Sequence, residues 1–173
     1  HNKVHEQCRQ IIRDDKMVGL VGGEHSVSFG NIQAHLEKYP KLNVLQFDAH
    51  MDLRVNYQNL EYSHASVYYN VVTKLPLKKL YQIGVRDFSP FELDVAESDN
   101  SIDYLTARDL KYRLFCGEGF GNILDDFFSE SSNEFYVSVD IDALEAFYCP
   151  NTGTPVPGGL NYWELFYILQ YLI

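Results

Sequence analysis

Residues capable of metal or acid–base chemistry gather in three short clusters of the 173-residue chain. They are GGEHS at 22–26, DAHMD at 48–52 and DID at 140–142. A single Asp after a strand is usually a turn former or a helix cap. Each cluster, however, follows an apolar run typical of a buried strand, and α/β sheets bind ligands beyond the carboxyl ends of their strands. Three such clusters therefore favour one shared site.

The residue types in these clusters indicate a metal site. The candidate ligands are His25, Asp48, His50, Asp52, Asp140 and Asp142. Four carboxylates and two imidazoles, with no cysteine, favour a harder divalent ion such as Mn²⁺ over a thiolate zinc site. In an extended backbone alternate side chains point to the same side, so the ligands of one cluster can converge. Six ligands are too many for one catalytic metal that keeps an open position, so we expect two ions with bridging carboxylates.

Short apolar strands alternate with amphipathic helices around these clusters. The strands are predicted at 17–21, 42–47, 80–85, 102–105 and 135–139, and the helices at 4–12, 27–38, 63–74, 89–96, 119–129 and 161–173. This alternation predicts a three-layer α/β/α architecture with a mostly parallel, doubly wound sheet. There is no internal repeat or low-complexity linker, so we expect a single domain over residues 1–173.

Composition and charge narrow the class of protein. Fourteen basic and 24 acidic residues give a net charge of −10, which argues against nucleic-acid binding. Cys8, Cys116 and Cys149 are odd in number and widely spaced, which is typical of a reducing compartment rather than a disulfide framework. No apolar run of about 18 residues and no signal-peptide pattern occurs. We therefore expect a cytoplasmic protein that binds neither nucleic acid nor membrane.

Taken together, the motifs resemble a known family. GGEHS at 22–26, DAHMD at 48–52, SVDIDAL at 138–144 and PNTGTPVPGG at 150–159 are similar to the signatures of the arginase, agmatinase and formimidoylglutamase superfamily. The resemblance spans residues 17–165 and implies an arginase-like fold. It also implies a binuclear manganese hydrolase that cleaves a linear C–N bond of a guanidino compound to urea and an amine. The SHAS sequence at 63–66 resembles an agmatinase-like branch, so agmatine is the first expected substrate.

The resemblance also implies roles for individual residues. One manganese ion would be held by His25, Asp48, Asp52 and Asp140, and the other by Asp48, His50, Asp140 and Asp142. The nucleophile would be a hydroxide between the metals. The amine that leaves needs a proton, and Asp52, hydrogen-bonded to the hydroxide, would carry that proton. His64 would shuttle a proton to the leaving group, for which the near-neutral pKa of imidazole is suited. Ala65-Ser66 replaces the family's Gly-Thr at this point, and the alternative is that His64 lines or caps a helix start.

Some family features are missing from the sequence. Members place a further strand, with a guanidinium-binding glutamate, beyond the last helix, and additional strands before the first. We therefore expect truncation at both ends and negligible turnover by this segment alone. The alternatives are formimidoylglutamase activity, arginase activity, or a truncated metal-binding domain without turnover. The GDxxD and GNH[DE] motifs of metallophosphoesterases do not occur, and a single-zinc deacetylase would not need Asp52 as well as Asp142.

Two expectations concern the remaining charges and the assembly. Arg54 and Arg86 are expected to form structural ion pairs. The protein is expected to be a homo-oligomer that acts on a small guanidino-type substrate.

Overall fold

Four parallel strands form a sheet in the order β3-β2-β1-β4. The structure is a computed structural model and describes residues 1–172. The strands are β1 (Asn43–Phe47), β2 (Lys79–Val85), β3 (Ile102–Thr106) and β4 (Phe135–Val139). Phe47, the last residue of β1, pairs with Ile83 of β2 and Val139 of β4. Because parallel strands end at the same edge, the residues that follow β1 and β4 lie next to each other.

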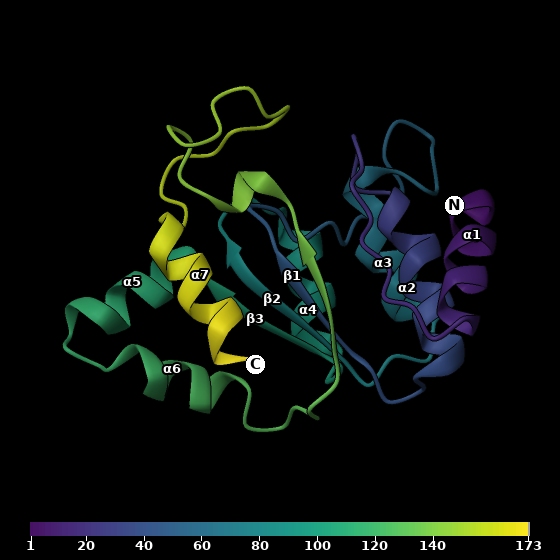
Figure 1. The fold of residues 1–173 in the computed structure, drawn as a ribbon. Coiled ribbons are helices and arrows are strands. Elements are labelled where there is room, and N and C mark those ends of the chain that lie inside the picture. Colours follow the sequence, from purple (N-terminus) through teal and green to yellow (C-terminus); the bar gives the residue numbers. More distant parts are fainter. Residues whose placement is uncertain (173) are drawn as a thin grey trace.

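Helices cover both faces of this sheet, as Figure 1 shows. They are α1 (Asn2–Arg13), α2 (Val27–Lys38), α3 (Val67–Lys74), α4 (Pro90–Ser98), α5 (Ala107–Phe115), α6 (Phe120–Phe127) and α7 (Tyr162–Tyr171). Helices α2, α3 and α4 share one hydrophobic core with the sheet, and α5, α6 and α7 share another. Helix α1 packs on the outer side of α2. The predicted three-layer α/β/α architecture is confirmed.

The two cores follow from the alternation of side chains along the strands. On β1, Val44 belongs to the core under α2 and α3, whereas the next residue, Leu45, belongs to the core under α5, α6 and α7. Both side chains are fully buried, as expected for a central strand of a parallel sheet.

Two of the predicted helix starts are also confirmed. Ser89 accepts a hydrogen bond from the Glu92 amide, and Asn161 accepts one from the Glu164 amide.

The strand predicted at 17–21 is wrong. The segment is irregular, and Met17 and Val21 are 95% and 99% exposed. A strand is stabilised by pairing with a neighbour, and no strand in residues 1–172 pairs with this segment. Apolar content alone therefore did not make it a strand.

Helix α5 was not predicted. It begins directly after β3, where the Thr106 side chain accepts a hydrogen bond from the Asp109 amide. The predicted helix at 161–173 is observed as α7, and its last predicted residue, 173, lies outside the described residues. No helix in the described part of the chain combines the length and apolar character needed to cross a membrane.

Candidate metal centre

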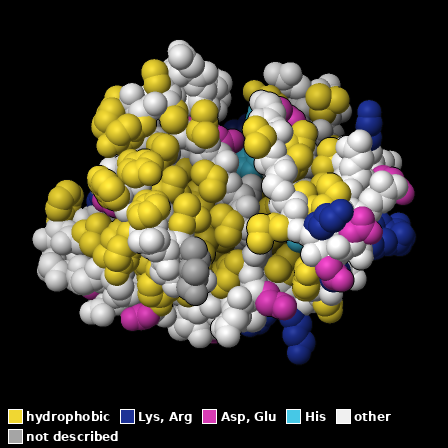
Figure 2. Space-filling view, in the orientation of Figure 1, with side chains coloured by type: hydrophobic (Ala, Val, Ile, Leu, Met, Phe, Trp, Pro, Cys, Tyr) yellow, Lys and Arg dark blue, Asp and Glu magenta, His cyan; other side chains and the backbone are white. Residues whose placement is uncertain are grey.

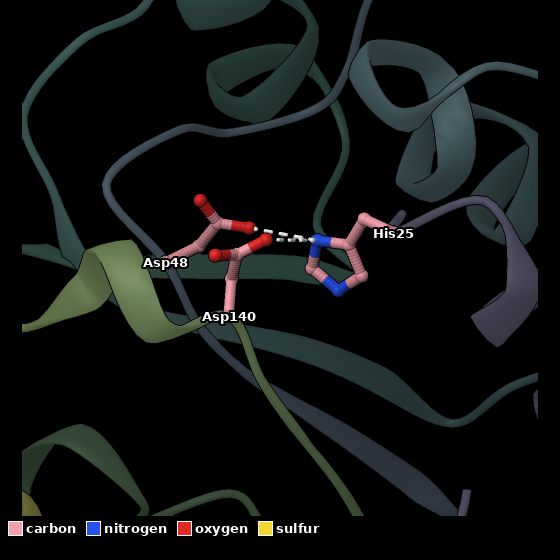
Figure 3. Close-up of side chains that lie close together, drawn as sticks. All are labelled: His25, Asp48 and Asp140. Atoms are coloured by element: carbon pink, nitrogen blue, oxygen red, sulfur yellow. Dashed lines mark ion pairs between the residues drawn. The ribbon is translucent and has the colours of Figure 1, made fainter. Parts of the chain in front are cut away.

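The shared edge of β1 and β4 brings the candidate ligands together. Asp48 follows β1 and Asp140 follows β4, and the Asp140 amide donates a 2.9 Å hydrogen bond to the Phe47 carbonyl. His25 approaches from the turn that precedes α2. Figure 3 shows the carboxylates of Asp48 and Asp140 directed toward the ring of His25. The clusters that contain Asp48 and Asp140 thus lie at this sheet edge, close to the cluster that contains His25.

The first group of ligands surrounds Nδ1 of His25. This nitrogen lies 3.0 Å from Asp48 Oδ2, 3.2 Å from Asp52 Oδ2 and 3.4 Å from Asp140 Oδ2. It is buried, yet none of these oxygens forms a hydrogen bond of suitable geometry with it. A divalent cation satisfies one imidazole lone pair and several carboxylates at once, so this donor set fits a hard metal ion.

The second group surrounds Nδ1 of His50. This nitrogen lies 3.3 Å from Asp48 Oδ1 and 3.3 Å from Asp142 Oδ2. Asp48 therefore presents one oxygen to each histidine. The candidate ligand atoms of His25, Asp48 and Asp140 lie within 4.8 Å of one another, and so do those of Asp48, His50 and Asp142. The bridging role of Asp140 stays a prediction, because its ligand atom is grouped with the first set alone.

The electrostatics of the metal-free cluster reflect crowded negative charge. Burial, which alone would lower the pKa of His25, is outweighed by Asp48 and Asp52, which raise that pKa well above its usual value. Hydrogen bonds to Asp142 and Asp48 raise the pKa of His50 to about 10. Burial and the charge of Asp48 raise the pKa of Asp52 to about 7. Without a cation, the carboxylate charge is balanced by protons held on the neighbouring histidine and aspartate side chains.

Asp52 reaches this group through an unusual backbone conformation. Its φ is +55°, in the left-handed region, so the extended backbone assumed for the DAHMD cluster does not continue through this residue. Its carbonyl accepts 3.2 Å hydrogen bonds from the amides of Tyr68 and Tyr69, which as first-turn amides of α3 lack helical acceptors. The next amide, that of Leu53, donates to the buried carboxylate of Glu92 at 3.2 Å. These contacts hold the strained turn.

His64 lies at the start of the short 3₁₀ helix η1 (His64–Ser66) and lines the same cavity as the candidate ligands. The cavity has a volume of about 500 Å³. His64 Nδ1 lies 3.3 Å from Glu24 Oε1, and its ring packs edge-on against Tyr57. About half of the His64 side chain is exposed. Figure 2 shows the corresponding notch at the top of the molecule, with histidine and acidic side chains at its base.

Several residues that support the site were not identified from the sequence. Arg86 was expected in an ion pair but instead donates to main-chain carbonyls of the loop after β4, including those of Asp142 and Val156. Arg54 does form an ion pair, at 3.5 Å from Glu92. Glu92 is only 3% exposed. The helix start at Ser89 was predicted from the sequence, but the contact of Glu92 with the DAHMD turn depends on tertiary packing.

Comparisons with known proteins agree with this architecture. A family model described as the arginase family matches residues 1–173. The N(1)-aminopropylagmatine ureohydrolase of Thermus thermophilus is 33% identical over 171 residues, which are 98% of this chain and 55% of that protein. The agmatinase of Pyrococcus horikoshii is 36% identical over 153 residues, or 88% of this chain and 48% of that protein. The chain thus spans about half the length of these curated relatives.

Among solved structures, the arginase from Medicago truncatula superposes with a TM-score of 0.83 at 28% identity. The match covers 98% of this chain and 52% of that structure. The formimidoylglutamase from Bacillus subtilis has a TM-score of 0.84 at 23% identity, a likeness of fold alone.

Proposed function

This chain belongs to the arginase family, and from that premise we propose that it carries the metal centre of a ureohydrolase. The proposed reaction cleaves a linear C–N bond of an agmatine-like guanidino compound, releasing urea and an amine. The observation that carries the proposal is the position of Asp48, whose two oxygens face His25 and His50. A carboxylate shared between two ligand groups is what a binuclear centre requires.

We propose Mn²⁺ as the metal, with two ions per chain. His25, Asp48, Asp52 and Asp140 would hold the first ion, and Asp48, His50, Asp140 and Asp142 the second. The all-oxygen and imidazole donor set and the buried, unpartnered Nδ1 of His25 support this proposal. When bound, two such cations lower the pKa of water enough to make a hydroxide nucleophile available at neutral pH.

The side chains of the cavity would manage the protons of the reaction. Attack on a guanidinium carbon gives a tetrahedral centre, and the amine that leaves it must gain a proton. Asp52, at the base of the cavity, would accept the proton lost by water. His64, at the rim, would deliver a proton to the amine, as positioned histidines commonly do. That both residues line one cavity supports this division of roles.

The proposed substrate class rests on the relatives and on the charge of the cavity. The two relatives with the names agmatinase and aminopropylagmatine ureohydrolase are among the similar proteins. Glu24 and Asp87 add acidic side chains to the lining of the cavity, beside the candidate ligands. An acidic lining favours a cationic substrate through electrostatic attraction. Arginine and formiminoglutamate are the alternatives to be tested beside agmatine.

The decisive experiment measures bound metal and product together. The polypeptide encoded by the whole reading frame that contains this chain is reconstituted with Mn²⁺. It is then analysed for metal content and assayed for urea from agmatine and arginine and for formamide from formiminoglutamate. We expect two manganese ions per chain and urea release from agmatine. A saturated ratio of one metal, or preferential binding of zinc at equal supply, would overturn the binuclear manganese proposal. Product from another of these compounds would overturn agmatine as the substrate.

A single domain over residues 1–173, a cytoplasmic location and a homo-oligomeric assembly stay predictions from the sequence.

A further inference from the structure

Tyr68 of α3 contacts two candidate ligands of the first group through separate atoms. Its hydroxyl oxygen lies 3.2 Å from Nε2 of His25. Its ring packs edge-on against the His25 ring, with centroids 5.3 Å apart. Its amide donates a 3.2 Å hydrogen bond to the carbonyl of Asp52. The side chain is fully buried, so these contacts are made in the interior of the protein.

The chemistry of a histidine ligand gives the hydroxyl a purpose. An imidazole that offers Nδ1 to a cation carries its proton on Nε2, and this N–H needs a hydrogen-bond acceptor. Two hydroxyl oxygens lie beside Nε2 of His25, namely that of Tyr68 and, at 3.0 Å, that of Ser138. Phenol and alcohol oxygens both accept such a bond. The surroundings of Nε2 thus match a ring whose Nδ1 faces a metal.

The backbone amide of Tyr68 contacts the second candidate ligand, Asp52. Asp52 has a left-handed φ, which is costly for a residue with a side chain and persists only where neighbouring groups hold it. The Tyr68 amide is one of the two that bond to its carbonyl. A shift of Tyr68 would therefore move both His25 and Asp52. The side chain of His50, in contrast, lies beside Asp48, Asp87 and Asp142 rather than beside Tyr68.

We propose that Tyr68 is a positioning residue that orients His25 for the first metal ion and selectively strengthens the binding of that ion. The inference rests on the proposed function, in that it takes the His25 group to bind a metal. It assigns to Tyr68 no contact with substrate. The backbone bond to Asp52 is unchanged by a side-chain substitution, so the hydroxyl can be tested separately.

The test compares two substitutions that each remove one buried phenol oxygen. Tyr68→Phe removes the oxygen beside His25. Tyr81→Phe is the matched control, because Tyr81 is equally buried, its hydroxyl has no hydrogen-bond partner, and it packs against Phe127 and Phe128 on the other face of the sheet. Chemical denaturation of the metal-free forms establishes that both variants fold.

Mn²⁺ titrations are made in two backgrounds that isolate the ions. His50→Asn leaves the first group intact, and His25→Asn leaves the second. In the His50→Asn background, we expect Tyr68→Phe to lower the affinity for Mn²⁺ by roughly 10-fold or more. A loss of this size is usual when a histidine ligand loses its hydrogen-bond partner. The ion of the His25→Asn background should keep its affinity. Tyr81→Phe should leave both affinities unchanged.

The outcomes separate this inference from the proposed function. If the unsubstituted chain binds two ions and Tyr68→Phe changes neither affinity, Tyr68 serves only the hydrophobic core and the inference is wrong. Equal losses in both backgrounds, or the same loss in Tyr81→Phe, would overturn it as well. If the unsubstituted chain binds no ion at the His25 group, the proposed metal centre fails, and the role of Tyr68 fails with it.

Discussion

The guanidinium of Arg86 donates a 2.8 Å hydrogen bond to the main-chain carbonyl of Asp142. The same group also donates to the carbonyls of Leu144, at 3.2 Å, and Val156, at 2.6 Å. Arg86 directly follows β2, whereas its acceptors lie in the loop after β4. One side chain thereby links the ends of two strands that are not neighbours in the sheet. It supports Asp142 from the main chain, while the Asp142 carboxylate faces His50.

Arg86→Ala is predicted to destabilise the fold and to lower the affinity for the second ion, the one proposed at the His50 group. It removes several charge-assisted hydrogen bonds, each of which contributes roughly 1.5–3 kcal/mol. The expected loss of unfolding free energy is about 2–3 kcal/mol, because water enters to replace some of these bonds. Chemical denaturation and Mn²⁺ titration in the His25→Asn background measure the two effects. Arg86→Lys should retain only part of the stability and only part of the Mn²⁺ affinity, because an ammonium lacks the planar fork that reaches several carbonyls. An unchanged denaturation midpoint in Arg86→Ala would contradict the prediction.

Asp48→Asn is predicted to abolish retention of both ions. Its carboxylate is the group that faces both histidines, and an amide offers one neutral oxygen in place of two charged ones. His50→Asn is the matched comparison, since it alters the second group alone and should leave one ion per chain. Metal analysis after gel filtration gives the number of manganese ions bound per chain in each of the two variants. Retention of one ion by Asp48→Asn would show that Asp48 is not shared.

The affinity for Mn²⁺ is predicted to rise with pH. In the metal-free chain, Asp142 and Asp48 raise the pKa of His50 to about 10, so its ring is protonated at neutral pH. A cation binds only the neutral ring and must displace this proton, which makes the apparent affinity increase up to about tenfold per pH unit below that pKa. The ring of His25, whose pKa is also raised, loses a proton in the same way, and Asp52, with its pKa raised to about 7, adds a further displaced proton at lower pH.

Titrations at several pH values, or proton release in weak buffer, measure this linkage. The slope should be steeper below pH about 7 than above it, since Asp52 then loses a proton on binding in addition to the two histidine rings. His50→Asn removes one of the two protonated rings and should make the dependence above pH about 7 shallower, whereas the ring of His25 still loses its proton on binding. An affinity that is constant across the range would mean that no proton competes with the metal.

The sequence allowed the convergence of most candidate ligands to be predicted because they are local in sequence and follow strand ends. Asp48 and Asp140 each come directly after a buried strand, and parallel pairing then places them side by side. The segment 17–21 shows the limit of this reasoning. Its apolar residues match the pattern of a buried strand, but strand formation depends on a pairing partner elsewhere in the chain. His25 was nevertheless singled out, because the GGEHS motif also resembles a signature of the family.

The supporting residues could not be predicted in the same way. Tyr68 and Arg86 have sequence contexts typical of a core aromatic and a surface charge. Their roles arise from contacts across 43 residues, between Tyr68 and His25, and across 56 residues, between Arg86 and Asp142. No local periodicity encodes such contacts. The left-handed φ of Asp52 was equally hidden, because aspartate adopts that region only in particular turns.

His64→Ala is predicted to spare both metal ions and to slow turnover. His64 lines the cavity, but it pairs with Glu24 rather than with a candidate ligand. Loss of a positioned proton-transfer group lowers kcat by roughly 10²–10⁴-fold. KM for agmatine should change much less, because proton delivery to the leaving amine is needed in the transition state rather than in binding. His35→Ala is the matched control, since His35 lies on α2 against Tyr136 and does not line the cavity. Steady-state kinetics with metal analysis of both variants, made in the polypeptide encoded by the whole reading frame, decide the assignment. Normal kcat in His64→Ala would return His64 to the alternative role of a residue that lines the start of a helix.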